Sequence, residues 1–249
     1  MVEIHLPLYA PAKPNAPPPP SHRTLKTTMP EHAPILPVIA AEVAALAPGF
    51  RALSLTVEAA PIVRPEIADR AVERACQALA RGEPDWAEAH LAAWAEAFRR
   101  FGAKPQRTPC SAEALRKRAL RDGGLPSIDP VVDLYNAISV QFAIPVGGET
   151  FDTLKNGEAV DESPDPGEVV WRDDLGVTCR RWNWRQGVRT RLDASARRMW
   201  FILESLPEMP LAALHEAGGL LLDELRLMMP GMRADSRLLC VATEPTDSV

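Results

Sequence analysis

The chain has 249 residues, of which 46% are hydrophobic and 24% are charged. These values are ordinary for a globular protein with one large domain or two small ones. The formal net charge of −5 disfavours a dedicated binder of duplex DNA, because such proteins carry a strongly basic footprint. No apolar run reaches the ~18–20 residues that a membrane span needs, so we do not expect a membrane partner.

The cysteines and the first residues indicate the compartment. The four cysteines lie far apart and form no CxxC or CxxH pair, so we expect free thiols and no structural zinc site. The first thirty residues lack the apolar segment of a signal peptide. We therefore expect a reducing, cytoplasmic location and no metal or other cofactor.

Composition divides the chain into three predicted segments. Residues 1–33 are rich in proline, which removes backbone donors and predicts a disordered tail. Such a tail can adopt polyproline II and dock a partner protein. The folded domain is predicted over residues 34–230, and residues 231–249 are predicted to form a C-terminal tail.

The first half of the folded segment is rich in predicted helices, and the second half is rich in predicted strands. Residues 35–46 fit a strand or a short helix, and residues 52–63 alternate as a strand does. Amphipathic spacing and capping residues predict helices over 66–81, 85–101, 111–121 and 131–142. Later patterns predict strands over 168–173, 177–184 and 199–205, then a helix over 211–229. This order predicts one α+β domain.

Residues 125–152, LPSIDPVVDLYNAISVQFAIPVGGETFD, place polar groups inside an apolar run. Asp133 and Asn136 interrupt a helical apolar pattern. Because an unpaired buried polar group costs several kcal/mol, such interruptions indicate a hydrogen-bond network or a site. A capping or network role and a catalytic role both remain open for these two residues.

Residues 179–187, CRRWNWRQG, have the same character. In a strand, Trp182 and Trp184 share one face, while Asn183 lies with Arg181 and Arg185 on the other. The tryptophans then belong to the core, and the face with Asn183 is the candidate site.

Arginine is concentrated around this segment. Residues 172–198 contain eight arginines, three aspartates and no lysine, so the window is basic within an acidic chain. Arginine favours bidentate or stacked recognition of phosphates and bases over simple charge steering. A solvated surface is the alternative interpretation.

Together these motifs resemble the B3/B4 domain of the phenylalanyl-tRNA synthetase beta chain. The matching positions are Ile128, Asp129, Pro130, Val131, Val132, Asp133, Asn136, Pro145, Phe151 and Asp152. Freestanding bacterial B3/B4 proteins are more similar still, with LPSIDPVVDLYNAIS, PVGGE and a CRRWNWRQ-like strand. The resemblance covers roughly residues 35–229. It implies a three-layer α+β domain with mixed or antiparallel sheets flanked by helices.

The synthetase domain hydrolyses tyrosine that has been attached wrongly to tRNA, so the resemblance implies tRNA editing in trans. The matching stretches include no aminoacylation module, and we do not expect tRNA charging. A family histidine falls at Gly147, and a family threonine is replaced by Tyr135. The small residues of the family's pocket floor align with the bulky stretch from Cys179 to Gln186. These departures predict a changed specificity.

The resemblance assigns expected roles. Hydrolysis of an activated ester needs a positioned water and donors for the developing oxyanion. The predicted catalytic residues are Asn136, Glu149 and Asn183, with Glu149 binding the α-amino group of the substrate or orienting water. Arg181 and Arg185 are expected to hold RNA phosphates, and Trp182 or Trp184 to stack the terminal adenine unless the tryptophans belong to the core. The remaining predicted binding residues are Tyr135, Gly147, Gly148 and Gln186.

The expected partner is therefore the 3′ end of tRNA or aminoacyl-tRNA. Two other hypotheses remain. One is a non-catalytic module that binds RNA or an amino-acid-like small molecule, and it is motivated by the missing histidine. The other is a protein-interaction adaptor that acts through the proline-rich tail.

Overall fold

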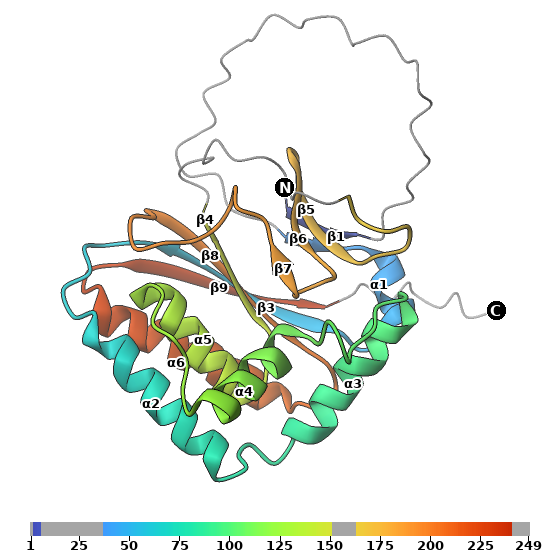
Figure 1. The fold of residues 1–249 in the computed structure, drawn as a ribbon. Coiled ribbons are helices and arrows are strands. Elements are labelled where there is room, and N and C mark those ends of the chain that lie inside the picture. Colours follow the sequence, from blue (N-terminus) through green and yellow to red (C-terminus); the bar gives the residue numbers. More distant parts are fainter. Residues whose placement is uncertain (1, 6–36, 151–162, 241–249) are drawn as a thin grey trace, which may run out of the picture.

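A computed structural model describes residues 2–5, 37–150 and 163–240 (Figure 1). In these ranges the chain forms six helices and nine strands, and the strands form two sheets. The predicted α+β class is confirmed. Four of the helices, a four-stranded sheet and a five-stranded sheet lie in three successive layers (Figure 1).

The four-stranded sheet is the centre of the domain, and its neighbouring strands are all antiparallel. Its order is β4 (Val146–Thr150), β8 (Arg198–Ser205), β3 (Arg51–Glu58) and β9 (Arg233–Cys240). In β3, Leu53, Leu55 and Val57 alternate toward one face and belong to the larger core. Because successive strand side chains point to opposite faces, the other face is left for the second sheet.

Four helices cover the first face (Figure 1). They are α2 (Glu66–Ala80), α4 (Ser111–Asp122), α5 (Pro130–Phe142) and α6 (Leu211–Met228). α5 begins at Pro130, one residue before the predicted start, and Asp129 caps it by accepting a hydrogen bond from the Val131 amide at 2.9 Å. Asp133 is a network residue, since its carboxylate accepts from Ser127 and from the Ile128 amide. The carboxylate therefore fixes the chain entering α5.

The five-stranded sheet packs over the second face. Its order is β2 (Pro37–Ile39), β1 (Val2–His5), β5 (Val170–Asp173), β6 (Gly176–Arg180) and β7 (Arg185–Gln186). Trp171 of this sheet meets Trp200 of β8 edge to face, with ring centroids 5.5 Å apart. The short helix α1 (Ala41–Leu46) and α3 (Ala87–Arg100) complete this second core.

Two strands lie in segments predicted as tails. Val2–His5 forms β1, which pairs with β2 and β5, while residues 6–33 lie outside the described residues. Arg233–Cys240 forms β9 and pairs along all of β3, so the predicted C-terminal tail begins too early. β9 is an edge strand with mostly exposed residues, and its polar sequence therefore lacks a core pattern. The domain boundaries themselves stay predictions.

The predicted strand over 177–184 is also wrong in its second half. β6 ends at Arg180, and Arg181 and Trp182 have positive φ angles of 47° and 65°. The turn is held because the Trp182 amide donates to the Val169 carbonyl at 2.6 Å and the Arg181 amide donates to the Glu168 carboxylate at 2.9 Å. The expected alternation of tryptophans and arginines on opposite faces therefore does not occur.

Candidate functional site

A cavity of about 300 Å³ lies between the two sheets, beside α4 and α5. Four of the six tryptophans of the chain line it: Trp171, Trp182, Trp184 and Trp200. Its polar lining residues are Ser111, Asn136, Glu149, Asn183, Gln186 and Glu204. An apolar pocket with a few convergent polar groups is typical of a small-molecule site.

The floor of the cavity is made by β4 and β8. Gly147 pairs with Ile202, and Glu149 pairs with Trp200. Glu204 donates its amide to the Pro145 carbonyl at 3.0 Å, one step beyond the paired residues. Side chains alternate along a strand, so Glu149 and Glu204 face the same side. Four residues separate their positions, which is ~13 Å along the strands.

Glu204 occupies one end of the floor and is only 1% exposed. Its Oε1 accepts from the indole N–H of Trp171 at 2.9 Å, and its Oε2 accepts from the Asn183 amide at 3.0 Å. Burial raises the pKa of this carboxyl to about 7, and the donors around it offset part of the rise. Both oxygens of Glu204 are thus held in a fixed orientation.

Glu149 occupies the other end and is also buried. Burial raises the pKa of its carboxyl to about 7, against opposing effects from the hydroxyls of Thr178 and Thr190. Within the part of the chain that the structure describes, its Oε2 has no hydrogen-bond partner. The two carboxyls therefore share burial and a raised pKa but differ in their partners.

Asn183 links two elements of the cavity wall. Its Oδ1 accepts from the Ser111 amide in the first turn of α4 at 3.2 Å, while its Nδ2 donates to Glu204. Ser111 is the first residue of α4, and Cys110 is its N-cap. Since both ends of the amide have partners, Asn183 is placed to position Glu204.

Asn136 differs from Asn183 in its hydrogen bonds within the described part of the chain. It lines the cavity from α5 and is half-buried. No side-chain hydrogen bond to it occurs among the described residues. Its amide is therefore free to donate to a ligand in the cavity.

The cavity brings together eight of the ten predicted site residues. They are Tyr135, Asn136, Gly147, Gly148, Glu149, Trp182, Asn183 and Gln186. Gln186 donates to the Gly148 carbonyl at 2.8 Å. A Cβ atom at Gly148 would lie 2.9 Å from the Tyr135 ring, which explains the glycine, whereas one at Gly147 would meet only Ile202 at 3.4 Å.

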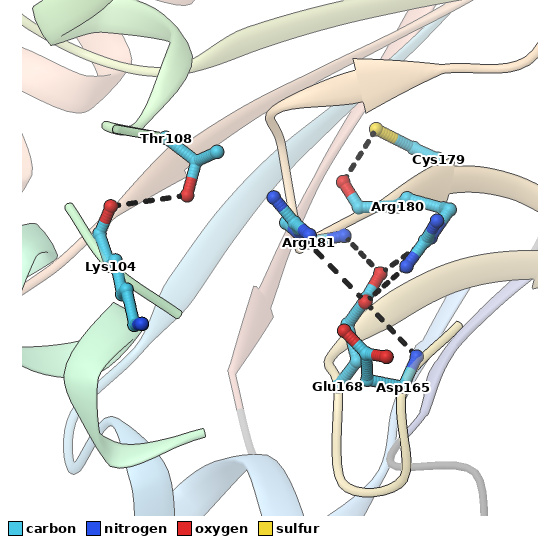
Figure 2. Close-up of polar contacts among 7 residues, drawn as sticks. All are labelled: Lys104, Thr108, Asp165, Glu168, Cys179, Arg180 and Arg181. Carbon is cyan, nitrogen blue, oxygen red and sulfur yellow. Dashed lines mark hydrogen bonds and ion pairs between the residues drawn. The ribbon is translucent and has the colours of Figure 1, made fainter. Parts of the chain in front are cut away.

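Arg181 and Arg185 do not line this cavity. The close-up in Figure 2 shows Arg181 beside Glu168, with which it forms an ion pair at 3.9 Å. Glu168 also forms a buried ion pair with Arg180 at 2.7 Å. The guanidinium of Arg181 lies 5.1 Å from the Trp184 ring centroid. The two predicted phosphate-binding residues thus flank lining residues in sequence without entering the cavity.

Trp182 is fully buried and packs edge to face against Phe50 and Trp94. It belongs to the core as well as to the cavity wall, so it offers no open ring face. Trp184 is half-buried and is the better placed indole for stacking.

Sequence reasoning missed Glu204 and Cys179. A signal for Glu204 exists, because it is a charged residue at the end of the apolar strand MWFILES. Cys179 lies in the cavity wall, and burial followed by the charges of Glu149 and Glu204 raises the pKa of its thiol well above the usual range. A protonated thiol is a poor nucleophile, so Cys179 does not supply one.

Neither a cluster of metal ligands nor a membrane-spanning helix occurs in the ranges that the structure describes. Over residues 2–5, 37–150 and 163–240, no three His, Cys, Asp or Glu side chains cluster as metal ligands. No helix in these ranges combines the length and apolar character of a membrane span.

Comparison with known proteins gives one match. The family model of the B3/4 domain matches residues 93–217, which is 125 of the 249 residues and includes most of the cavity wall. A search of curated proteins found no match.

Proposed function

The chain belongs to the B3/4 domain family, which is associated with the phenylalanyl-tRNA synthetase beta chain and with RNA binding. From this premise we propose that the chain binds the aminoacylated 3′ end of a tRNA and hydrolyses a mischarged aminoacyl ester in trans. The observation that supports it best is the cavity between the sheets, with tryptophan walls and two buried carboxyls. Its volume suits an amino-acid-sized group.

The carboxyl at the Glu204 end is suited to orient the attacking water. Its pKa is about 7, close to the value at which a general base works best near neutral pH. Asn183 and Trp171 fix its orientation, so Asn183 acts as a positioning residue. The free amide of Asn136 is suited to donate to the oxyanion.

The reaction needs no further reactant. The water oxygen bonds to the ester carbonyl carbon while its proton passes to Glu204, and the carbonyl oxygen becomes the oxyanion. When the bond between this carbon and the ribose oxygen breaks, the ribose oxygen takes the proton back. The products are the free amino acid and the uncharged tRNA.

The RNA would approach along the turn after β6. Arginine and half-buried tryptophan side chains gather there, with Arg181 stacked on Trp184. Single-stranded RNA is commonly held by stacking and by guanidinium contacts to phosphate. We assign Arg181 and Arg185 to the phosphates and Trp184 to the terminal base.

Deacylation of charged tRNA tests this proposal. Purified protein is mixed in excess with tRNAs that carry correct or incorrect amino acids, and the release of each amino acid is timed. We expect hydrolysis of at least one mischarged tRNA, and Glu204→Gln should slow it by at least ~100-fold. Glu216→Gln makes the same change on the exposed side of α6 and serves as the control. If the protein deacylates none of the charged tRNAs, the hydrolytic proposal is wrong.

A second candidate is a binding module without catalysis. It is favoured by the lack of histidine among the described residues of the cavity wall, where Gly147 replaces the histidine of the related domain. In that case, charged tRNA should bind more tightly than uncharged tRNA while the ester stays intact over the same period.

A further inference from the structure

Three buried oxygens have no hydrogen-bond partner among the residues that the structure describes, and one of them belongs to Glu149 in the cavity wall. They are Glu149 Oε2, Thr178 Oγ1 and Thr190 Oγ1. The three residues are 4%, 1% and 2% exposed. Both hydroxyls lie close enough to the Glu149 carboxyl to lower its pKa, so the three oxygens form one cluster.

Among the residues that the structure describes, no basic side chain forms an ion pair with Glu149. Arg189 acts on its carboxyl through its charge. Arg189 forms a two-point ion pair with Asp173, with N–O distances of 2.6 and 2.7 Å. Its charge is therefore committed to Asp173, and Asp173 itself disfavours ionisation of Glu149. A buried carboxylate without a paired cation is costly, and Glu149 lines the cavity, where a ligand can supply that cation.

We propose that Glu149, supported by the neighbouring hydroxyls of Thr178 and Thr190, forms a subsite for a primary ammonium group of the ligand. The inference rests on the proposed function and deepens it, because the group recognised is then the free α-ammonium of the aminoacyl ester. Glu149 binds this group, and the water-orienting role falls to Glu204 at the opposite end of the floor.

An ammonium fits this cluster better than the other cations. It carries three N–H donors and a compact charge, which suits a single carboxylate in the cavity wall whose neighbours are two hydroxyls. A guanidinium prefers a planar, two-point contact with both carboxylate oxygens. A divalent metal would need further acidic, histidine or cysteine ligands, and no such group of three occurs in the described ranges.

The position of the subsite orients the substrate. The ester carbon of an aminoacyl group is one carbon removed from the carbon that bears the amine. An ammonium at Glu149 thus places the ester over Gly147, between the two ends of the floor. A ligand whose amine is acylated has neither the charge nor the three donors, so the subsite selects against N-acylated substrates.

Binding of stable amino-acid amides tests the subsite. The probes are L-phenylalaninamide and L-leucinamide, each beside its N-acetyl counterpart, measured by isothermal titration calorimetry. We expect wild-type protein to prefer at least one free amine by at least ~10-fold over its acetylated form, as for other charge-assisted hydrogen bonds. Glu149→Gln should abolish this preference, and Thr190→Val should reduce it by ~3–10-fold. Glu216→Gln should retain it.

Two results would overturn the subsite. One is equal binding of the free and acetylated amides, which is the result for a cluster that holds only trapped water. The other is a full preference for the amine in folded Glu149→Gln protein. Deacylation of tRNA distinguishes a failure of the subsite from a failure of the proposed hydrolysis. If aminoacyl-tRNA and N-acetylaminoacyl-tRNA are hydrolysed equally, the subsite is wrong and the hydrolysis stands. If the protein binds the free amines selectively but deacylates no tRNA, the subsite stands and the proposed hydrolysis is wrong.

Discussion

The two ends of the cavity floor carry the same residue in different states. Glu204 and Glu149 are both buried, and burial raises the pKa of each carboxyl to about 7. At the Glu204 end, Trp171 and Asn183 donate to the two oxygens. At the Glu149 end, one carboxylate oxygen and two nearby hydroxyls have no partner within the described ranges.

The Glu204 carboxyl is thus held in one orientation, whereas the Glu149 carboxyl lacks a partner for one oxygen among the described residues. A buried polar network whose members are paired fixes one geometry, which suits a group that must orient water. Buried polar atoms without partners are rare and call for an explanation, such as a missing ligand or water. The comparison therefore assigns chemistry to the Glu204 end and ligand recognition to the Glu149 end.

The largest expected effect comes from filling the floor between the two ends. A Cβ atom at Gly147 meets only Ile202, at 3.4 Å, so Gly147→Val fits the strand and projects methyl groups into the cavity. We expect amide binding and tRNA deacylation to fall by at least ~100-fold, because the ligand must span this point. Gly219→Ala, on the exposed side of α6, is the control. Undiminished binding in Gly147→Val would show that the two ends do not serve one ligand.

Removing a partner at the Glu204 end should cost stability. Asn183→Ala leaves Glu204 Oε2 and the Ser111 amide without their hydrogen bonds. We expect the free energy of unfolding in urea to fall by ~2–4 kcal/mol. Asn136→Ala is a matched control in the same cavity. Its amide has no hydrogen bond within the described part of the chain, so it should lose deacylation rate with little stability. Equal losses of stability in both variants would contradict the account.

Neutralising Glu149 should raise the free energy of unfolding, whereas Asn183→Ala should lower it. Its folded pKa of about 7 lies above the ordinary value of 4.5. The carboxyl therefore favours folding most below pH 4.5, and this contribution is lost as the pH rises through about 7. The groups that act on it are Asp173, Arg189, Thr178 and Thr190. Glu149→Gln should thus unfold like wild type at low pH and be more stable by ~3 kcal/mol well above pH 7. A loss of stability at high pH would show that ionised Glu149 has a partner.

The smallest effect is expected at Cys179, whose thiol pKa is raised by burial and by the charges of both carboxyls. Because a protonated thiol supplies no nucleophile, Cys179→Ala should change the deacylation rate by less than ~3-fold. A loss of two orders of magnitude, with thiol alkylation blocking the wild type equally, would make the thiol part of the chemistry.

Local patterns in the sequence predicted the helices and much of the site. Apolar spacing identified α2 and α5 to within one residue at each end. Polar residues inside apolar runs identified Asn136 and Asn183 as cavity residues. These signals depend on neighbouring residues, and a single sequence contains them.

The missed features depend on distant contacts. The turn at Arg181 and Trp182 has positive φ without glycine, and it is held by Glu168 and Val169 from the segment that precedes β5. β9 is mostly exposed, so its sequence has the polar pattern that is typical of a tail. The facing of Glu204 and Glu149 arises from the register of β4 with β8, which local patterns do not encode.

The central claim is tested most directly by titrating the glutamate carboxyls with ¹³C NMR. Protein labelled at glutamate is titrated from about pH 5 to about pH 9, with and without saturating L-phenylalaninamide, and Glu149→Gln and Glu204→Gln identify the two signals. The account predicts that the amide lowers the pKa of Glu149 from about 7 to below ~6, because an ammonium stabilises the carboxylate. It also predicts that the pKa of Glu204 changes less. If the amide binds and the pKa of Glu149 does not move, the account is contradicted.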